Sequence, residues 1–225
     1  MPYLCRWTAI FLTAGAALFA QSRTAIENDQ VRVVVVTDHP HAKTALHDHK
    51  LNRVMVYLQP GRQDIQYQDG RKVNLEWKAG EAKWSAASGM HVSEVMSESP
   101  VTIVEVEVKK PGDPAKAVKT ALDPPKVAPQ SYHVEFENDQ VRVTRVRIGA
   151  HQSVPVHEHV LNRVVVYITD QNSRMTIAND KNLADGKVES AQHKAGEASW
   201  GAPVKHKEEN VSDKPFEAVG VELKN

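Results

Sequence analysis

Cysteine is almost absent from this sequence of 225 residues, and the one that occurs, Cys5, lies close to the start. Disulfides, cysteine nucleophiles, cysteine-ligated zinc and iron–sulfur clusters are therefore excluded from the rest of the chain. A surplus of charge is absent as well, because 28 Lys and Arg balance 28 Asp and Glu. The sequence thus lacks the basic surplus that is typical of a nucleic-acid-binding protein, and it has no acidic tail.

A hydrophobic run long enough to cross a bilayer is also missing. The apolar run from Thr8 to Phe19 has roughly 12 residues, whereas a spanning helix needs about 20. Arg6 precedes this run and Ala20-Gln21-Ser22 follows it, which matches the charged, apolar and cleavage regions of a secretory signal peptide. We therefore predict a signal peptide over residues 1–20 and a periplasmic or secreted protein without stable membrane insertion. A membrane anchor or a buried helix is the alternative.

Histidine, in contrast, is abundant, and six of the 11 histidines fall in two matching groups. The segment from His47 to Tyr57 is HDHKLNRVMVY, and the segment from His157 to Tyr167 is HEHVLNRVVVY. Side chains of an extended strand alternate between its two faces, so a His-x-His pair offers two imidazoles to one metal ion. The next three residues predict a short hairpin loop, and Arg-Val-x-Val-Tyr predicts the returning strand.

The match extends well beyond these segments. Ile26 to Gln59 aligns without a gap with Phe136 to Thr169, and later segments recur in the same order. Two copies of one unit of roughly 85 residues are therefore present, rather than an array of small repeats. We predict two domains, at residues 21–110 and 131–225. Residues 111–130 form a proline-rich linker, which is expected to be extended with one helical turn around residues 115–122.

Each unit has the pattern of an all-β domain. Val31 to Val36 is a continuous β-branched run, and Phe216 to Leu223 alternates between apolar and other residues. Long amphipathic helices are missing from both units, so short strands with turns predict a sandwich or barrel. In the second unit the apolar phase changes between Val143 and Val146, which predicts a β-bulge near Thr144.

The repeated unit resembles the cupin domain, and the chain after residue 20 resembles a bicupin over nearly its whole length. Cupins have a first motif with His-x-His and a later Glu, and a second motif with a glycine-rich turn before a third His. The resemblance implies two small jelly-roll barrels, each with three His converging inside it. The matching residues are His47, His49 and His91 in the first unit, and His157, His159 and His206 in the second.

The resemblance implies a metal site in each barrel, and a three-His site is suited to Fe, Mn, Zn or Cu. The alternative is a former metal site whose His side chains now form hydrogen bonds. The chain departs from the family where the metal-binding Glu is expected, because Arg53 and Arg163 occupy that position. Arg stays protonated, so it cannot ligate a metal ion and disfavours a cation nearby.

An Arg beside three His indicates an anchor for a small carboxylate or another anion, with a structural ion pair as the alternative. Some three-His cupins that oxidise thiols also lack the Glu and use Arg to hold the substrate carboxylate. This chain resembles them in the composition of the site alone. Tyr57 and Tyr167 share a strand face with Arg53 and Arg163, so they are ligand-binding candidates, with core packing as the alternative.

Other residues have structural interpretations. His41 and His151 replace a Gly that cupins usually have before the His pair, which places them in a turn. His193 is interpreted as a surface or turn residue. Trp84 and Trp200 are interpreted as packing residues of the barrel core or the domain interface.

Three functions follow from these observations. The first is a metal-dependent enzyme in which Arg positions an acidic substrate. The second is a metal-free, non-catalytic protein that binds a small anion through His and Arg. A purely structural pair of barrels is the third, and it is disfavoured because unsatisfied polar residues inside a barrel cost stability. The partner is a small molecule, and either a monomer or a homodimer is expected.

Overall fold

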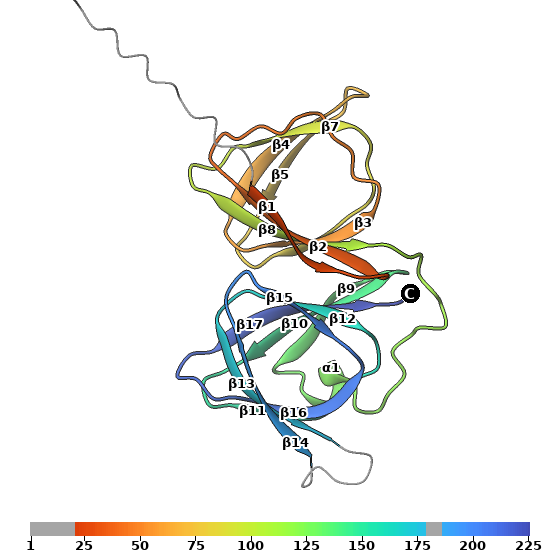
Figure 1. Cartoon of the computed structure of the whole chain (residues 1–225), viewed down its shortest axis with the longest axis vertical. Helices are drawn as coiled ribbons and strands as arrows, with labels where there is room; N and C mark the ends of the chain where they lie inside the picture. Colours follow the sequence, from red (N-terminus) through yellow and green to blue (C-terminus); the bar gives the residue numbers. More distant parts are fainter. Residues whose placement is uncertain (1–20, 179–185) are drawn as a thin grey trace, which may run out of the picture.

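The computed structural model describes residues 21–178 and 186–225, so the predicted signal peptide lies outside the described part. Those residues form two all-β units, stacked along the long axis of the molecule (Figure 1), which confirms the predicted fold class. No helix in the described ranges is long and apolar enough to span a membrane. The first unit consists of β1 (Gln21–Glu27), β2 (Val31–Asp38), β3 (Asn52–Tyr57), β4 (Gly61–Tyr67), β5 (Lys72–Trp77), β6 (Ala82–Ser85), β7 (His91–Val95) and β8 (Val101–Val108).

The second unit repeats this order with one additional strand. Its elements are β9 (Tyr132–Glu137), β10 (Val141–Ile148), β11 (Ser153–His159), β12 (Arg163–Tyr167), β13 (Gln171–Ile177), β14 (Lys187–His193), β15 (Ala198–Gly201), β16 (Val204–Asn210) and β17 (Phe216–Leu223). Each unit has a five-stranded sheet, in the orders β1-β2-β8-β3-β6 and β15-β12-β17-β10-β9. The opposite walls are the sheets β5-β4-β7 and β11-β16-β13-β14.

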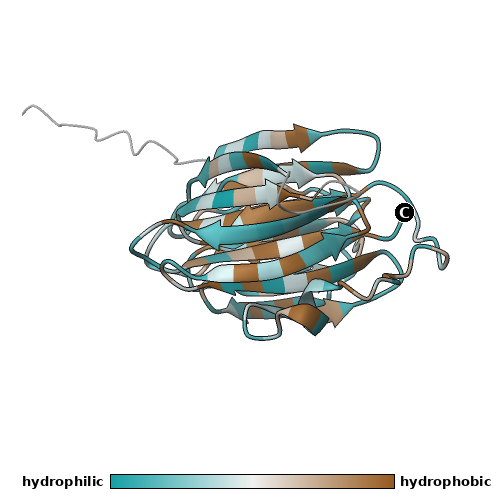
Figure 2. Cartoon of the chain, turned by 90° about the horizontal axis from the view of Figure 1, so that it is seen from below, coloured by the Kyte–Doolittle hydropathy of each residue, from teal (hydrophilic) through white to brown (hydrophobic). Residues whose placement is uncertain are grey.

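The two five-stranded sheets pack against each other through their outer faces. Valines from β2, β3 and β8 form one hydrophobic cluster with valines from β10, β12 and β17. Hydrophobic and hydrophilic residues alternate along several strands in Figure 2, as expected when the two faces of a strand have different surroundings. Equivalent residues also exchange hydrogen bonds, because Asn52 donates to Gln140 and Asn162 donates to Gln30. The duplication therefore gives the molecule a nearly symmetric internal interface.

The predicted hairpin after the His pair is wrong. β11 pairs with β16 in one sheet, whereas β12 pairs with β15 and β17 in the other. The intervening loop therefore crosses between the two walls of the barrel. In the first unit the His pair also lies outside the named strands, and His47 forms a single bridge with His91. Leu46 replaces the β-branched Val156 there, which lowers the β propensity at that position.

A register shift of the kind predicted near Thr144 lies between Val143 and Thr144 in the pairing of β10 with β9, where the extra residue, Glu135, belongs to β9. Against β17, β10 pairs in continuous register. Val143 faces the domain interface, whereas Val146 faces the interior of the second barrel. The apolar phase changes because both faces of this strand are buried, against different neighbours.

The turn predictions for two histidines are confirmed. His41 and His151 have positive φ angles of 58° and 56°, the left-handed conformation that favours glycine.

Between the two units, the helical turn is α1 (Pro124–Val127), so the predicted position around residues 115–122 is wrong. Pro124 provides the preset φ of a first helical turn. Asp123 beside it pairs with Arg142 at 2.9 Å, which attaches this part of the linker to the second barrel.

Candidate functional site

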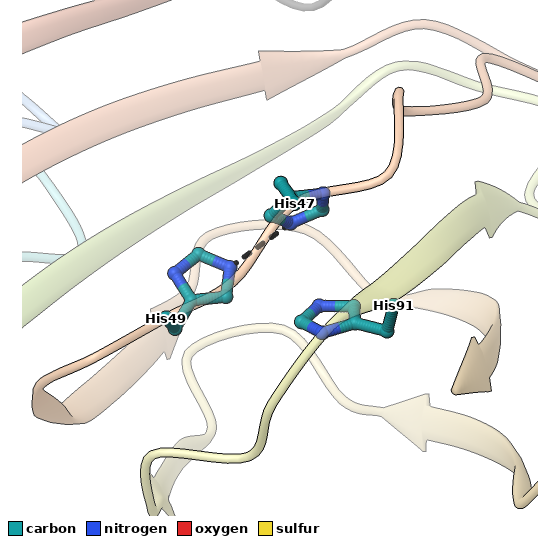
Figure 3. A group of neighbouring side chains, drawn as sticks. All are labelled: His47, His49 and His91. Atoms are coloured by element: carbon teal, nitrogen blue, oxygen red, sulfur yellow. Dashed lines mark hydrogen bonds between the residues drawn. The ribbon is translucent and has the colours of Figure 1, made fainter. Parts of the chain in front are cut away.

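The first histidine cluster comprises His47, His49 and His91, which point toward one another in Figure 3. The Nε2 atoms of His47 and His49 are 3.1 Å apart. The Nδ1 atoms of His47 and His91 each lie 2.8 Å from a backbone carbonyl. A carbonyl can only accept, so Nδ1 carries the proton and Nε2 keeps a lone pair directed at the other rings.

The second cluster comprises His157, His159 and His206, and it is more deeply buried. His157 Nδ1 donates to the carbonyl of Pro155 at 2.8 Å, and His159 Nδ1 donates to Glu222 at 3.3 Å. His206 is 3% exposed, and neither of its ring nitrogens has a partner among the described residues. A buried imidazole without a partner is costly, which indicates that His206 binds something the protein itself does not supply.

Burial keeps these imidazoles neutral. It lowers the pKa of His206 to about 2, aided by the neighbouring His157. It lowers the pKa of His49 to about 3, aided by Arg53, and that of His157 to about 4. The pKa values of His91 and His159 are lowered mainly by the same cause. All five rings therefore present lone pairs at neutral pH, as metal ligands must.

A cavity of about 600 Å³ lies in the second barrel beside His159 and His206. This volume is within the range of small-molecule sites. Apolar side chains from several strands form much of its wall, among them Val146, Val165, Ile177 and Phe216. Arg163 and Tyr167 also line it, so the structure brings both predicted ligand-binding residues of the second barrel to one cavity.

The two predicted arginine anchors have different surroundings. Arg53 faces Glu105 at 3.4 Å, although its Nη1 atom has no partner within the described ranges. The position of Glu105 is taken by Gly220 in the second barrel, where a Cβ would meet only the Thr144 carbonyl, at 3.8 Å. Arg163 is 9% exposed and donates to the carbonyl of Ala202 at 2.8 Å. No carboxylate in residues 21–178 or 186–225 forms an ion pair with it.

The two predicted tyrosines differ in the same way. Tyr57 is buried and stacks on Trp77, with ring centroids 4.4 Å apart, inside a packed core. Tyr167 stacks on His193 at 4.0 Å and shares a hydrogen bond with the Ser199 hydroxyl. His193 occupies the position of Trp77 and lines the cavity, so its interpretation as a surface or turn residue is wrong. The smaller imidazole leaves space that the indole fills in the first barrel.

Sequence reasoning missed a polar group on the cavity wall. Glu208 is buried, accepts from Gln171 Nε2 at 2.8 Å, and lies 3.3 Å from the Tyr132 hydroxyl. That hydroxyl is also 3.3 Å from His157 Nε2. Burial raises the pKa of the Glu208 carboxyl. The first unit has Ser22, Gly61 and Ser93 at the positions of Tyr132, Gln171 and Glu208, so the duplication gives no signal for this group.

A hydrogen bond backed by two ion pairs holds one histidine of the second cluster. Glu222 accepts from His159 and from Arg142, and Arg142 also pairs with Asp123 of the linker. A carboxylate behind a histidine fixes the ring orientation and makes the inward nitrogen more basic. In the first barrel, Glu105 and Glu107 lie close to His49, and these three residues form a third group that could hold a metal ion. Arg53 and Arg32 balance these two carboxylates.

Solved structures provide the comparison, since no protein-family model and no curated protein sequence matches the chain. AerE from Microcystis aeruginosa is 14% identical with a TM-score of 0.66, over 95% of this chain and 96% of that one. An oxalate decarboxylase from Bacillus subtilis is 16% identical with a TM-score of 0.60, over 92% and 72%. A cupin 2 conserved barrel domain protein from Leptotrichia buccalis is 13% identical with a TM-score of 0.54, over 95% and 92%.

These likenesses establish the fold. The chain has the fold of the cupin superfamily in duplicate, as two jelly-roll barrels of a bicupin. Each barrel brings its three predicted His together, close enough for them to hold one metal ion.

Proposed function

We propose that this protein binds a small carboxylate in its second barrel, beside a divalent metal ion held by His157, His159 and His206. The observation that carries this proposal is Arg163, a buried guanidinium that forms no ion pair with the described residues, on the wall of a cavity of about 600 Å³. A buried positive charge is costly unless an anion compensates it. A ligand carboxylate would supply that compensation in a two-pronged pair.

The donor set fits a metal ion in both barrels. Two histidines in each cluster turn their Nδ1 protons outward, and His206 has both nitrogens unpartnered among the described residues. Nitrogens 3.1 Å apart, as in His47 and His49, can both lie about 2.1 Å from one ion. One of the solved structures with this fold, the oxalate decarboxylase of Bacillus subtilis, has Mn(II) centres. Fe, Mn, Zn and Cu all accept imidazole ligands.

The side chains of the second barrel have distinct tasks in this proposal. Arg163 binds and orients the ligand carboxylate, and the apolar wall around Val165 and Phe216 excludes water from it. Glu222 holds the proton of His159 on the side away from the cluster. A bound metal ion would supply a Lewis acid or an activator of oxygen. We further propose that the protein acts in the periplasm or outside the cell, on the basis of the predicted signal peptide.

Metal analysis tests this function directly. Chelator-treated protein would be reconstituted separately with Mn, Fe, Zn and Cu, and the bound metal measured by elemental analysis. We expect about two equivalents of the preferred metal per chain, because each barrel brings three imidazoles together. His206→Gln should remove one of them, and His91→Gln should remove the other. Less than about a tenth of an equivalent with every metal would exclude a metal-dependent function.

A metal-free binding protein is the second candidate, and Arg163 is the observation that favours it. After burial, its positive charge is a further cause that lowers the pKa of all three histidines of the second cluster. It opposes a metal cation for the same electrostatic reason. A thermal shift caused by a carboxylate separates the two functions. A shift that survives a chelator supports the metal-free protein, whereas loss of the shift with the chelator supports the metal-dependent one.

A further inference from the structure

Gln171, at the start of β13, has an acceptor atom without a donor. Its Nε2 group donates to Glu208 at 2.8 Å and to Ser173 at 3.1 Å. These two bonds fix the orientation of the amide, which leaves Oε1 as the free end. The residue is 8% exposed and lines the cavity, yet Oε1 has no partner within residues 21–178 and 186–225. A buried carbonyl in this state requires an N–H or O–H from a bound molecule.

Thr144, on β10, is a second such residue on the wall of the same cavity. It is 6% exposed, and its Oγ1 atom also lacks a partner in the described part of the chain. The neighbouring Gly220 leaves the space beside it open. A threonine hydroxyl can both donate and accept, so it can complete a pair of hydrogen bonds to one ligand hydroxyl.

The first barrel lacks both groups. Its equivalent positions hold Val34 and Gly61, and a Cβ on Gly61 would lie 2.5 Å from the Trp77 ring. The polar pair is therefore not required by the barrel fold, because a barrel of the same chain does without it. Unsatisfied polar atoms in a core cost stability, so two of them in one cavity indicate a ligand rather than a packing role.

We infer that Gln171 and Thr144 form a specificity site for an uncharged hydroxyl group, and that the ligand of the second barrel is a small hydroxy carboxylic acid. The inference rests on the proposed function, in which Arg163 takes the carboxylate of the same ligand. The ligand hydroxyl donates to Gln171 Oε1 and accepts from the Thr144 hydroxyl. Apolar walls beside these groups, including Val146 and Phe216, accommodate a hydrocarbon body.

Charge distinguishes a hydroxyl from an ammonium group at this position. Arg163 already brings one positive charge to the cavity, and a divalent metal ion in the proposed function would add to it. Three carboxylates line the cavity and could attract an ammonium, but each already has a partner. Glu208 accepts from Gln171, Glu222 pairs with Arg142, and Glu189 pairs with Lys187. The ammonium group of an amino acid would therefore meet like charge without a free partner, which disfavours it.

Calorimetric titration with two matched sets of probes tests the inference. The first set is propionate, lactate and alanine, and the second is 3-phenylpropionate, 3-phenyllactate and phenylalanine. Within each set the three compounds share a carbon skeleton and differ only at one substituent. We expect the hydroxy acid to bind the full-length protein about tenfold more tightly than the unsubstituted acid in at least one set. The amino acid should bind most weakly.

Two variants and one control assign the effect to the proposed atoms. Thr144→Val removes the hydroxyl at nearly constant shape, so it should abolish the preference while thermal stability stays the same or rises. Thr144→Ser should keep the preference, and Gln171→Met should reduce it. Thr176→Val is the matched control, because Thr176 lies on β13 without lining the cavity. It should leave the preference intact.

The outcomes separate this inference from the function on which it rests. Equal binding of the acid and the hydroxy acid, or tighter binding of the amino acid, would overturn the hydroxyl site while carboxylate binding stands. A preference that survives in Thr144→Val and Gln171→Met would overturn it as well. If no probe binds at all, the carboxylate site and the hydroxyl site are both wrong.

Discussion

Neutral imidazoles are the feature of single residues that most affects this protein in acid. Burial holds the pKa values of His49, His157 and His206 below the ordinary value, so the unfolded chain binds protons that the folded chain does not. The contribution of such a group to stability is complete above about pH 6.5 and is lost as the pH falls toward the folded pKa. Glu105 and Glu208, whose pKa values are raised by burial, act in the opposite direction above about pH 4.5.

The contribution of a single histidine, His206, to this pH dependence of stability can be measured. We expect the free energy of unfolding of metal-free protein to fall between pH 6 and pH 5, by about 1 kcal/mol per pH unit for each buried His. His206→Gln should reduce this slope by about 1 kcal/mol per pH unit. Urea titrations at several pH values in the presence of a chelator measure it. Equal slopes for the variant and the parent would show that His206 is not buried as a neutral ring.

The candidate residues that could be predicted from sequence are those that the two copies share. Six His and both Arg recur at matching positions, and the structure brings each set of His together. Gln171, Glu208 and Thr144 could not be found in this way, because the other copy has different residues at their positions. These positions also lie on strands that approach the histidines only through long-range pairing, which a local pattern does not reveal.

Individual strands are fitted to the contents of their own barrel. β4 begins at Gly61, where a Cβ would lie 2.5 Å from the Trp77 ring and 2.9 Å from Val101. β17 contains Gly220, beside which the cavity is open. The absence of a side chain thus has a different cause at each of these two glycines. One is required by a large neighbour, and the other leaves room for a ligand.

Alanine at these two glycines distinguishes the filled barrel from the open one. Gly61→Ala should lower the free energy of unfolding by about 1–3 kcal/mol, because its Cβ must displace a packed indole. Gly220→Ala should change it by less than about 1 kcal/mol, because open space receives the methyl group and the unfolded chain loses entropy. Urea unfolding of both variants gives the comparison. Equal effects would contradict the difference between the two interiors.

Strand existence followed from sequence more readily than strand pairing. β-branched runs correctly predicted β2, β10 and β12, because such residues fit a pleated surface wherever they pair. The loop after the His pair was taken for a hairpin, since a turn that crosses between two sheets has the same short polar composition. The phase change in β10 predicted an irregularity near Thr144, and the pairing with β9 has one there, but the change itself arises because both faces of β10 are buried.

On the scale of the whole molecule, two similar barrels share one core and differ inside. The outer faces of the five-stranded sheets are alike in both units, since they meet across a nearly symmetric interface. The interiors are free to differ because each faces only its own strands. The first holds a stacked Tyr57 and Trp77 and a paired Arg53, whereas the second holds a cavity lined by Arg163. Duplication thus predicted the fold of both units, but it could not predict how their interiors differ.

Calorimetric titration of the intact protein with a small carboxylate tests this division of roles most directly. We expect about one carboxylate per chain, because the second barrel alone combines an unpaired guanidinium with a cavity among the described residues. Arg163→Ala should weaken that binding by about 30-fold or more, as expected when a buried charge pair loses one partner. Arg53→Ala, its counterpart, should leave the affinity and the stoichiometry unchanged. Two carboxylates per chain, or equal losses in the two variants, would contradict the account.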